Sequence, residues 1–419
     1  MNEQHIATVE AILPGGEGLV RQHNNTVLIP NTAVGDNIQF QYTQKKRGTF
    51  RGELVHIITP SPQRVEANCP VAHSCGGCAL QHLSQQTQAE LKNTWVTDAF
   101  QAFITQDTSL IPEQAHQAGF GGRRRARWFM NQGKLGFRKR FSHDVVHTHH
   151  CMALTQHLDT LRSQLEETNL PQHIQSIQAV ELSNGTHIIL ESEQSCPTDF
   201  IPPTMPSIQG KQQWWWRKLE TPSIKALHKP IQTLYDRIQI SAETHIDIHI
   251  GPNDFIQGHA QGNQALVQQI LAWSSDAKRV VDLFSGCGNL SLPLAKALNA
   301  TVLGAELNPA SVQAANHNAK RLGVNATYQT LDLFGNFTTE PFSNADILIL
   351  DPPRKGAKRI CQHIGKLFPK KIIMVNCDIA AGARDAQALS DAGFTLQALR
   401  PLDLFPYTGH VEALSLWQA

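Results

Sequence analysis

The sequence predicts an α/β protein whose C-terminal part is a doubly wound, Rossmann-like domain. Between residues 251 and 419, six short apolar runs alternate with helical patterns, as in a parallel sheet covered by helices. A glycine turn follows the first run, at the point where such domains bind ligands. In front of this domain we expect a small β-barrel over residues 1–60 and a central domain over residues 61–250.

Residues 1–60 show five short alternating or apolar runs, separated by the turn-rich segments LPGGEG, NTAVG and KKRG. This spacing is typical of a small barrel of the OB type, a common platform for oligonucleotides. A fold does not fix a function, so the barrel supports RNA binding only weakly.

The central region starts after a proline-containing linker, TPSPQR, and continues from about residue 120 as short strands with polar loops. Three consecutive tryptophans, Trp214 to Trp216, form either a packing plug or a base-stacking surface. We favour packing, because large aromatic side chains are mostly buried.

One segment of the central region is strongly basic, although the net charge of the chain is only +1. Residues 121–140 contain no acidic side chain, and their basic residues are Arg123, Arg124, Arg125, Arg127, Lys134, Arg138, Lys139 and Arg140. Trp128, Phe129 and Phe137 are interleaved with them. Such a segment either follows a phosphate backbone and stacks bases, or pairs with carboxylates and faces solvent.

The helix expected after Glu306 has the clearest boundaries in the C-terminal domain. Asn308 suits the N-cap, Pro309 suits the first helical position, and Gly323 suits the end. The apolar face of this helix consists of Val312, Ala315, Ala319 and Leu322.

Composition limits the cellular setting. No apolar stretch approaches eighteen residues, so we predict no membrane span and no membrane partner. The N-terminus lacks the basic and apolar regions of a secretory signal, so we expect a cytoplasmic protein. There its eight cysteines should be reduced thiols or metal ligands.

The glycine turn lies in VVDLFSGCGNLSLPLA, between a predicted strand and a predicted helix. Gly286 and Gly288 let the backbone turn sharply and approach a ligand. Glu306, at the end of the next strand, is placed to hold ribose hydroxyls. This pattern without a third glycine favours S-adenosylmethionine, which has no pyrophosphate, over a dinucleotide. The alternative is a tight turn without a ligand.

Three reactive side chains follow or begin other predicted strands. Asp351 ends the strand before DPPRKG, at the carboxyl edge of the sheet where such folds bind ligands, although the two prolines would also simply stop a strand. Glu412 lies between apolar neighbours, where a raised pKa would suit a general base; it equally suits a solvent-facing position. Cys377 follows KIIMVN and, taken alone, reads as an inert core cysteine.

Four other cysteines suggest a metal centre. Cys69, Cys75 and Cys78 are spaced C-x5-C-x2-C, and Cys151 is a distant fourth ligand. Four thiolates suit an iron–sulfur cluster or zinc, and the three-plus-one spacing favours the cluster. The histidines at 147, 149 and 150 leave a zinc site as an alternative. The remaining cysteines, Cys196, Cys287 and Cys361, read as ordinary residues.

Together these motifs resemble the bacterial RNA (uracil-5-)-methyltransferases, most closely the 23S ribosomal RNA enzymes with a TRAM domain and a [4Fe-4S] cluster. The resemblance implies that residues 1–60 are the TRAM domain and residues 251–419 the methyltransferase domain. It implies cluster ligation by Cys69, Cys75, Cys78 and Cys151. The cofactor motifs of the family fall on Gln257, Phe284, Gly286, Asn289, Glu306, Asp332 and Asp351.

The same resemblance implies the chemistry. Cys377 would add to C6 of uracil, so that C5 becomes enolate-like and accepts the methyl group of S-adenosylmethionine. Glu412 would then remove the C5 proton, and Asp351 would help to hold the uracil and the cofactor. Since a free thiol is mostly protonated at pH 7, we expect the site to favour the thiolate. The base must be unpaired or flipped out.

One motif departs from the family pattern. In NCDIAAGARD, Ile379 replaces the usual proline two places after Cys377, and Ala381 and Gly382 replace Thr-Leu. We expect a looser loop around Cys377, with the reaction type unchanged. RNA is the expected partner, with no obligate protein partner. Transfer RNA as substrate, and a catalytically impaired RNA-binding iron–sulfur protein, are the alternatives.

Overall fold

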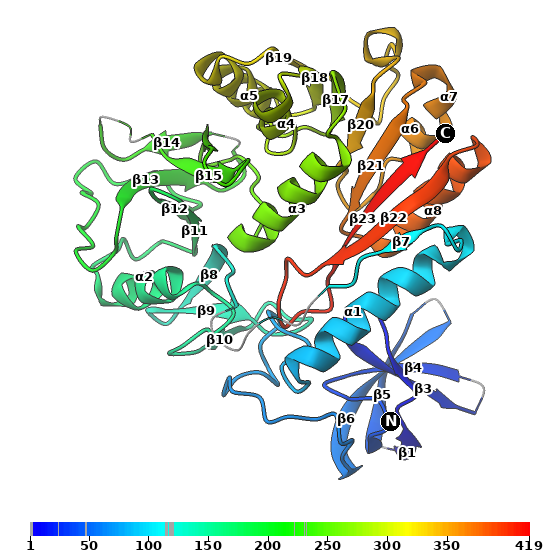
Figure 1. Ribbon diagram of the computed structural model, residues 1–419. Coiled ribbons are helices and arrows are strands. Elements are labelled where there is room, and N and C mark those ends of the chain that lie inside the picture. Colours follow the sequence, from blue (N-terminus) through cyan, green and yellow to red (C-terminus); the bar gives the residue numbers. More distant parts are fainter. Residues whose placement is uncertain are drawn as a thin grey trace.

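The computed structural model describes residues 3–23, 25–46, 48–113, 116, 121–221, 223–229, 231 and 233–419. Three regions follow one another along the chain (Figure 1). The N-terminal strands form a curled sheet, the middle part of the chain forms a second sheet, and the C-terminal residues form an α/β domain. The predicted fold class is confirmed.

The N-terminal region is a six-stranded, barrel-like sheet of order β1-β5-β6-β4-β3-β2. Alternate residues of its strands, such as Ile38 and Phe40, are fully buried, as the alternating pattern predicts. Its strands are β1 (Gln4–Thr8), β2 (Ala11–Ile12), β3 (Glu17–Gln22), β4 (Asn25–Pro30), β5 (Asn37–Lys46) and β6 (Thr49–Thr59).

The central region is built on a seven-stranded sheet of order β10-β9-β8-β11-β12-β13-β14, beside the hairpin β15–β16. Trp214, Trp215 and Trp216 are all buried, which confirms packing over base stacking. The strands are β8 (Arg125–Asn131), β9 (Lys134–Arg138), β10 (Val145–His147), β11 (Ser176–Leu182), β12 (Gly185–Ser192), β13 (Lys211–Lys218), β14 (Ile224–Ala226), β15 (Tyr235–Gln239) and β16 (His245–His249).

The C-terminal sheet has the order β19-β18-β17-β20-β21-β23-β22-β7. Strands β17 to β21 are parallel, whereas β23 runs antiparallel to both of its neighbours. The strands are β17 (Arg279–Leu283), β18 (Thr301–Glu306), β19 (Ala326–Thr330), β20 (Ile347–Leu350), β21 (Lys371–Asn376), β22 (Thr395–Leu402), β23 (Glu412–Gln418) and β7 (Ser109–Leu110).

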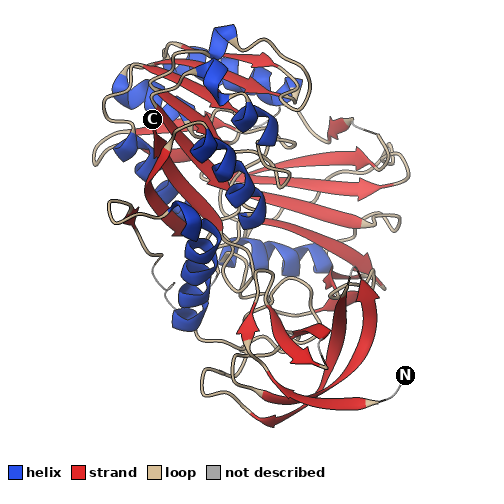
Figure 2. Cartoon of the chain, turned by 90° about the vertical axis from the view of Figure 1, so that its right-hand side faces the viewer, coloured by secondary structure: helices blue, strands red, loops and turns tan. Residues whose placement is uncertain are grey.

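Helices cover both faces of this sheet (Figure 2). Along β21, Ile372 and Met374 join one core, and Ile373 and Val375 join the other, as expected for a strand buried on both sides. The helices of the chain are α1 (Gln85–Phe100), α2 (Gln156–Glu167), α3 (Ala260–Trp273), α4 (Ser291–Leu298), α5 (Pro309–Leu322), α6 (Lys358–Gln362), α7 (Ile364–Leu367) and α8 (Ile379–Asp391), with short 3-10 turns at Gln101–Phe103 and Glu340–Phe342.

Helix α5 begins and ends where the sequence predicts. The Asn308 side chain accepts a hydrogen bond from the backbone N–H of Ala310, and Pro309 occupies the first turn. Gly323 ends the helix in the left-handed region, at φ 64°.

Helix α1 connects the barrel to the C-terminal sheet (Figure 1). Its Trp95 donates a hydrogen bond to the carbonyl of Ile12 at 2.7 Å. Its Lys92, with a fully buried side chain, pairs with Asp403 at 2.6 Å. The following strand, β7, joins the C-terminal sheet beside β22. The segment that carries Glu412 is therefore held by the N-terminal half of the chain.

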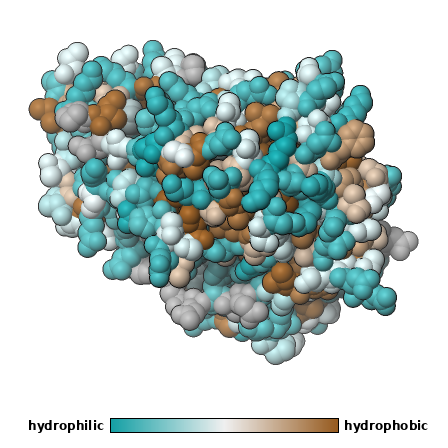
Figure 3. All heavy atoms as spheres, turned by 45° about the horizontal axis from the view of Figure 1, so that its top comes forward, coloured by the Kyte–Doolittle hydropathy of each residue, from teal (hydrophilic) through white to brown (hydrophobic). Residues whose placement is uncertain are grey.

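One face of the molecule is largely polar. On the face shown in Figure 3, hydrophilic side chains predominate, and hydrophobic ones gather near the middle. Within the described residues, none of the helices is both long enough and apolar enough to span a membrane.

Candidate active site and cofactor pocket

The catalytic residues predicted from the sequence meet at the carboxyl edge of β21. Asn376, the last residue of β21, pairs with Ala413 of the antiparallel strand β23. Cys377 directly follows Asn376 and Glu412 directly precedes Ala413, so both residues flank this pair, and the charge of Glu412 acts on the Cys377 thiol. Asp351, directly after the neighbouring strand β20, completes the group.

Both carboxyl groups have strongly raised pKa values. Glu412 is 3% exposed, and its Oε2 has no hydrogen-bond partner within the described part of the chain. Burial, followed by the charge of Asp351, raises the pKa of Glu412 to about 8. Burial, followed by the charge of Asp282, raises the pKa of Asp351 to about 7. Glu412 therefore has the pKa of a base that works near neutrality.

The Cys377 thiol is not activated in this structure, contrary to the expectation of a favoured thiolate. Its burial and the charges of Glu412 and Asp351 raise the pKa of Cys377 to about 11. The Arg354 guanidinium acts in the opposite direction on both Cys377 and Glu412. The two carboxylates that suit this site for proton transfer are thus also the groups that disfavour the thiolate.

A cavity at the same sheet edge contains most of the predicted cofactor residues. Five of them line it, namely Gln257, Phe284, Gly286, Asn289 and Asp351. Glu306 is connected to this cavity by a hydrogen bond from the backbone N–H of Gly286 at 3.3 Å. Asp332 is exposed after β19 and accepts from the backbone N–H of Phe334, outside the lining of the cavity.

The glycine turn exposes backbone to this cavity. Phe284, Gly286 and Gly288 all have positive φ, at 70°, 53° and 88°. A Cβ added at Gly286 would meet no atom within 4 Å, whereas one at Gly288 would clash with Leu292. Gly286 thus leaves space beside a ligand, and Gly288 allows the start of α4 to pack closely.

Polar groups in the cavity have unused hydrogen-bonding capacity. Gln257 donates to Asp351 at 3.5 Å, but its buried Oε1 has no partner among the described residues. The Asn289 amide forms a reciprocal pair with Asn263 at 2.8 and 3.0 Å. Space beside Gly286 and an unpaired buried acceptor fit a polar ligand such as S-adenosylmethionine.

Sequence reasoning missed two residues that support this pocket. Asp282 lines the cavity, is 1% exposed, and has a pKa raised to about 7 by burial. Its position at the start of the D-x-F-x-G-x-G turn was an available signal. Buried Arg124 donates to the carbonyl of Gln257 at 2.9 Å and pairs with Asp236 at 2.7 Å. Nothing in the basic run distinguishes Arg124 from its neighbours.

The expected loose loop after Cys377 is instead a helix. Helix α8 begins at Ile379, and Asp378 caps it by accepting from the backbone N–H of Ala381 at 2.9 Å. Gly382 lies within the helix, where a Cβ would come within 2.9 Å of Asn376. The glycine therefore permits close packing against the end of β21 and does not loosen the segment.

The next residues of α8 fasten the Asp351 segment to the same helix. Asp385 accepts from the backbone N–H of Ala357, and Arg384 donates to the carbonyl of Lys355 at 2.8 Å. Arg384 and Asp385 also pair with each other at 2.7 Å. Both segments that carry reactive groups, those of Cys377 and Asp351, are therefore fixed by one helix.

The four predicted metal-binding cysteines line one small cavity, together with Arg123 and Phe137. All four are free thiols. In the described residues, no group of three or more His, Cys, Asp or Glu side chains is arranged to hold a metal ion. Four thiols around one cavity are nevertheless the donor set that an iron–sulfur cluster or a zinc ion takes.

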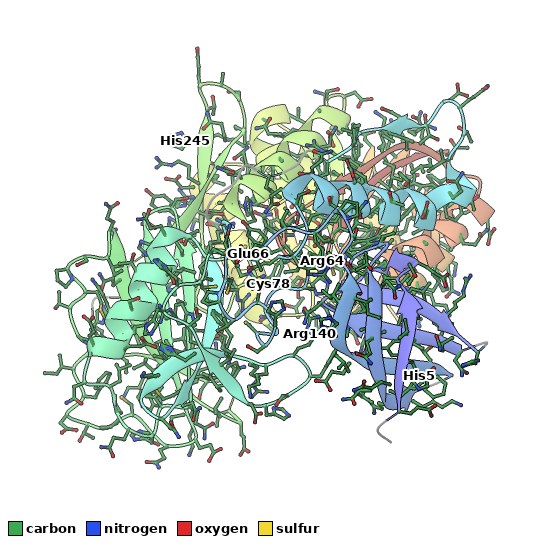
Figure 4. All side chains as sticks on the ribbon, turned by 90° about the horizontal axis from the view of Figure 1, so that it is seen from below. His5, Arg64, Glu66, Cys78, Arg140 and His245 are labelled. Carbon is green, nitrogen blue, oxygen red and sulfur yellow. The ribbon has the colours of Figure 1, made fainter. Side chains whose placement is uncertain are left out.

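Much of the basic segment has structural partners, as the second of the two predicted roles requires. Arg124, Arg127 and Lys139 pair with carboxylates, and Trp128 is fully buried. Arg140 donates to the carbonyl of Cys78 at 2.8 Å and thus supports the cysteine cavity. Figure 4 shows Arg140 and Cys78 where the barrel meets the central sheet.

Three comparisons place the chain among known proteins. The model of the TRM5/TYW2 methyltransferase domain matches residues 248–372. The 23S rRNA (uracil(1939)-C(5))-methyltransferase RlmD of Shewanella sp. (strain MR-4) is 31% identical over 96% of this chain and 93% of its own length. The enzyme of the same description from Pectobacterium carotovorum (strain PC1) is 31% identical over 98% of this chain and 93% of its own.

A solved structure supports the fold. The Pyrococcus abyssi tRNA (uracil-54, C5)-methyltransferase in complex with S-adenosyl-L-homocysteine has a TM-score of 0.75, with 20% identity over 99% of this chain and 100% of that one. At this identity the likeness concerns the fold alone. The identity and coverage of the curated relatives, together with the site described above, show that the chain belongs to the family of the 23S rRNA (uracil(1939)-C(5))-methyltransferases.

Proposed function

We propose that this protein methylates C5 of a uridine in 23S ribosomal RNA, at the position equivalent to the uracil 1939 of its relatives' names. The observation that carries the proposal is the proximity of Cys377 and Glu412 to Asp351, which lines the cofactor cavity. A nucleophile and a base on one edge of a sheet are what addition at C6 and proton removal at C5 require.

The residues of the chain divide the work as follows. Bound S-adenosylmethionine supplies an electrophilic methyl group. The Cys377 thiol loses its proton to solvent, and the thiolate sulfur bonds to C6, which makes C5 nucleophilic; after C5 is methylated, Glu412 accepts the C5 proton. The C6–S bond then breaks, and its electron pair returns to sulfur. Asp351 and Gln257 hold the uracil and the cofactor, while Glu306 holds the ribose end.

Arg354 affects the first step of this reaction, the addition of Cys377 to C6. Since Arg354 lowers the pKa of Cys377 and Glu412, any closer approach of its guanidinium increases the thiolate fraction. An RNA phosphate between Arg354 and Cys377 would instead decrease the thiolate fraction. The base reaches Cys377 only when it is unstacked from the RNA, which requires an unpaired or flipped uridine.

The cysteine cavity supports a second part of the proposal, a 4Fe-4S cluster held by Cys69, Cys75, Cys78 and Cys151. The cluster would fix the segment of Cys78 against Arg140, where the central region meets the barrel. Anaerobic purification should yield a brown protein containing iron and labile sulfide. A colourless protein with one zinc per chain would refute the cluster.

The proposed domains are residues 1–60, a TRAM-like barrel; 61–250, with the cluster; and 251–419, the methyltransferase domain. A ribosomal RNA substrate places the protein in the cytoplasm, where its thiols stay reduced.

The test of the proposed function is transfer of labelled methyl groups from S-adenosylmethionine to 23S rRNA that lacks the modification. The label should appear as 5-methyluridine at one position. Label in transfer RNA only would overturn the proposed substrate.

A further inference from the structure

A groove of about 1120 Å³ runs between the barrel and the turn that joins β9 to β10. A second hollow, of about 710 Å³, shares Arg51, Lys139, Arg140 and Phe141 with the first. The second hollow also reaches Arg354, in the segment after Asp351. The two hollows therefore form one continuous track from the barrel to the neighbourhood of Cys377.

Phe141 projects into both hollows from the turn after β9. It is 73% exposed, and its φ of 56° lies in the left-handed region that bulky residues rarely adopt. The guanidinium carbon of Arg51, on β6 of the barrel, lies 4.3 Å from the centre of the Phe141 ring. Because the ring is exposed, burial does not offset the strain of its backbone. Such strain is concentrated at functional sites.

The charge of the track is positive. Its lining cations are Arg51, Arg138, Lys139, Arg140 and Arg354. The lining carboxylates are Glu17 and Glu53. Arg51 neutralises Glu17 at 2.8 Å, and the exposed Lys139 lies 3.5 Å from Asp144 outside the lining. An excess of cations around an exposed ring is the combination that binds single-stranded nucleic acid.

We propose that Phe141 stacks on a base of single-stranded RNA that lies in this track, at a nucleotide other than the methylated uridine. Arg51 holds one side of the ring and leaves the other side to the base. This inference rests on the proposed function and adds to it a residue that determines RNA affinity. It also gives the barrel a defined task, because Arg51 belongs to the barrel and Phe141 to the central sheet.

The test is direct binding of unmodified 23S rRNA fragments to the cluster-containing protein, together with steady-state methylation. Phe141→Ala should raise the Kd and KM for RNA by at least about fivefold, since one stacked base contributes that much. Its kcat at saturating RNA should stay unchanged. Phe141→Trp should keep wild-type affinity. The matched control is Phe368→Ala, because Phe368 is 66% exposed with a φ of 48°, but lies at the end of α7.

A glycine variant separates stacking from a structural role. Phe141→Gly should lose as much RNA affinity as Phe141→Ala, yet unfold at the same temperature or higher, because glycine adopts positive φ without strain. Wild-type affinity in Phe141→Ala would overturn the inference while leaving the proposed function intact. Tight RNA binding without methyl transfer by the wild type would instead refute the proposed function, and the binding data would still decide the role of Phe141.

Discussion

Cys377 lies close to Glu412 because one strand of the C-terminal sheet is reversed. Strands β20 and β21 end at the carboxyl edge, whereas β23 begins there, since it runs antiparallel to β21. A parallel β23 would have placed Glu412 at the other edge of the sheet. The reversal thus brings the residue at the start of one strand beside the residue at the end of another.

The variant Glu412→Gln should stop the reaction after methylation. An amide in place of the carboxylate cannot accept the C5 proton, so the covalent RNA adduct should accumulate while release of 5-methyluridine falls by about 10²- to 10⁴-fold. A denaturing gel with labelled RNA detects the adduct. Product release by E412Q at the wild-type rate would show that another group takes the proton.

Activity should depend on pH through the same carboxyl group. Because burial raises the pKa of Glu412 to about 8, its base form is lost as the pH falls below that value. The raised pKa of Cys377 acts in the same direction. Since each of the two groups contributes up to about tenfold per pH unit, we expect kcat/KM to rise by up to about a hundredfold per pH unit between pH 6 and 8. A flat profile over this range would contradict the assignment of Glu412 as the base.

The buried carboxyl should also affect stability. An unfolded Glu412 titrates near the ordinary glutamate pKa of 4.5 and the folded one near 8, so the folded state binds the extra proton. The contribution of Glu412 is therefore fully favourable below about 4.5 and is lost as the pH rises toward 8. E412Q should gain stability relative to the wild type by roughly 1.4 kcal/mol per pH unit across this window. Urea unfolding at several pH values gives the difference, and a constant difference would contradict this account.

Ile379 should tolerate proline because it is the first residue of α8. Proline suits this position, whose N–H has no partner within the helix. We expect Ile379→Pro to keep wild-type stability and methylation rate. The control is Ala383→Pro, in the interior of the same helix, which should cost about 3 kcal/mol or more. Equal damage in both variants would refute the helical assignment around Cys377.

The cluster cysteines should differ from other cysteines in the same region. Cys151→Ser should lower the iron and sulfide content and the melting temperature, since Cys151 shares a cavity with Cys69, Cys75 and Cys78. Cys196→Ser is the matched control, because Cys196 is also partly buried but lies outside that cavity. Identical metal content in both variants would exclude Cys151 as a ligand.

The sequence predicts well those structural features that depend on residues close to one another in the chain. The boundaries of α5 follow from Asn308, Pro309 and Gly323, and the strands of the C-terminal sheet follow from short apolar runs. The apolar neighbours of Glu412 allow a raised pKa, and the burial of both faces of β23 decides it.

Features that depend on distant contacts are not predictable in this way. Strand β7 joins the C-terminal sheet through pairs between Ser109 and Ala398, far apart in sequence. Arg124 resembles its basic neighbours until Asp236 and Gln257 appear beside it. The protonation of Cys377 likewise depends on carboxylates from two other segments, which only the folded chain brings together.

The central claim is that Cys377 attacks C6 of a uridine, and trapping with RNA that carries 5-fluorouridine tests it most directly. Fluorine at C5 cannot leave as a proton does, so the reaction should stall as a methylated covalent adduct. Peptide mapping by mass spectrometry should place the RNA on Cys377, and Cys377→Ala should form no adduct. An adduct on another residue, or no adduct despite RNA binding and methylation of ordinary RNA, would contradict the account.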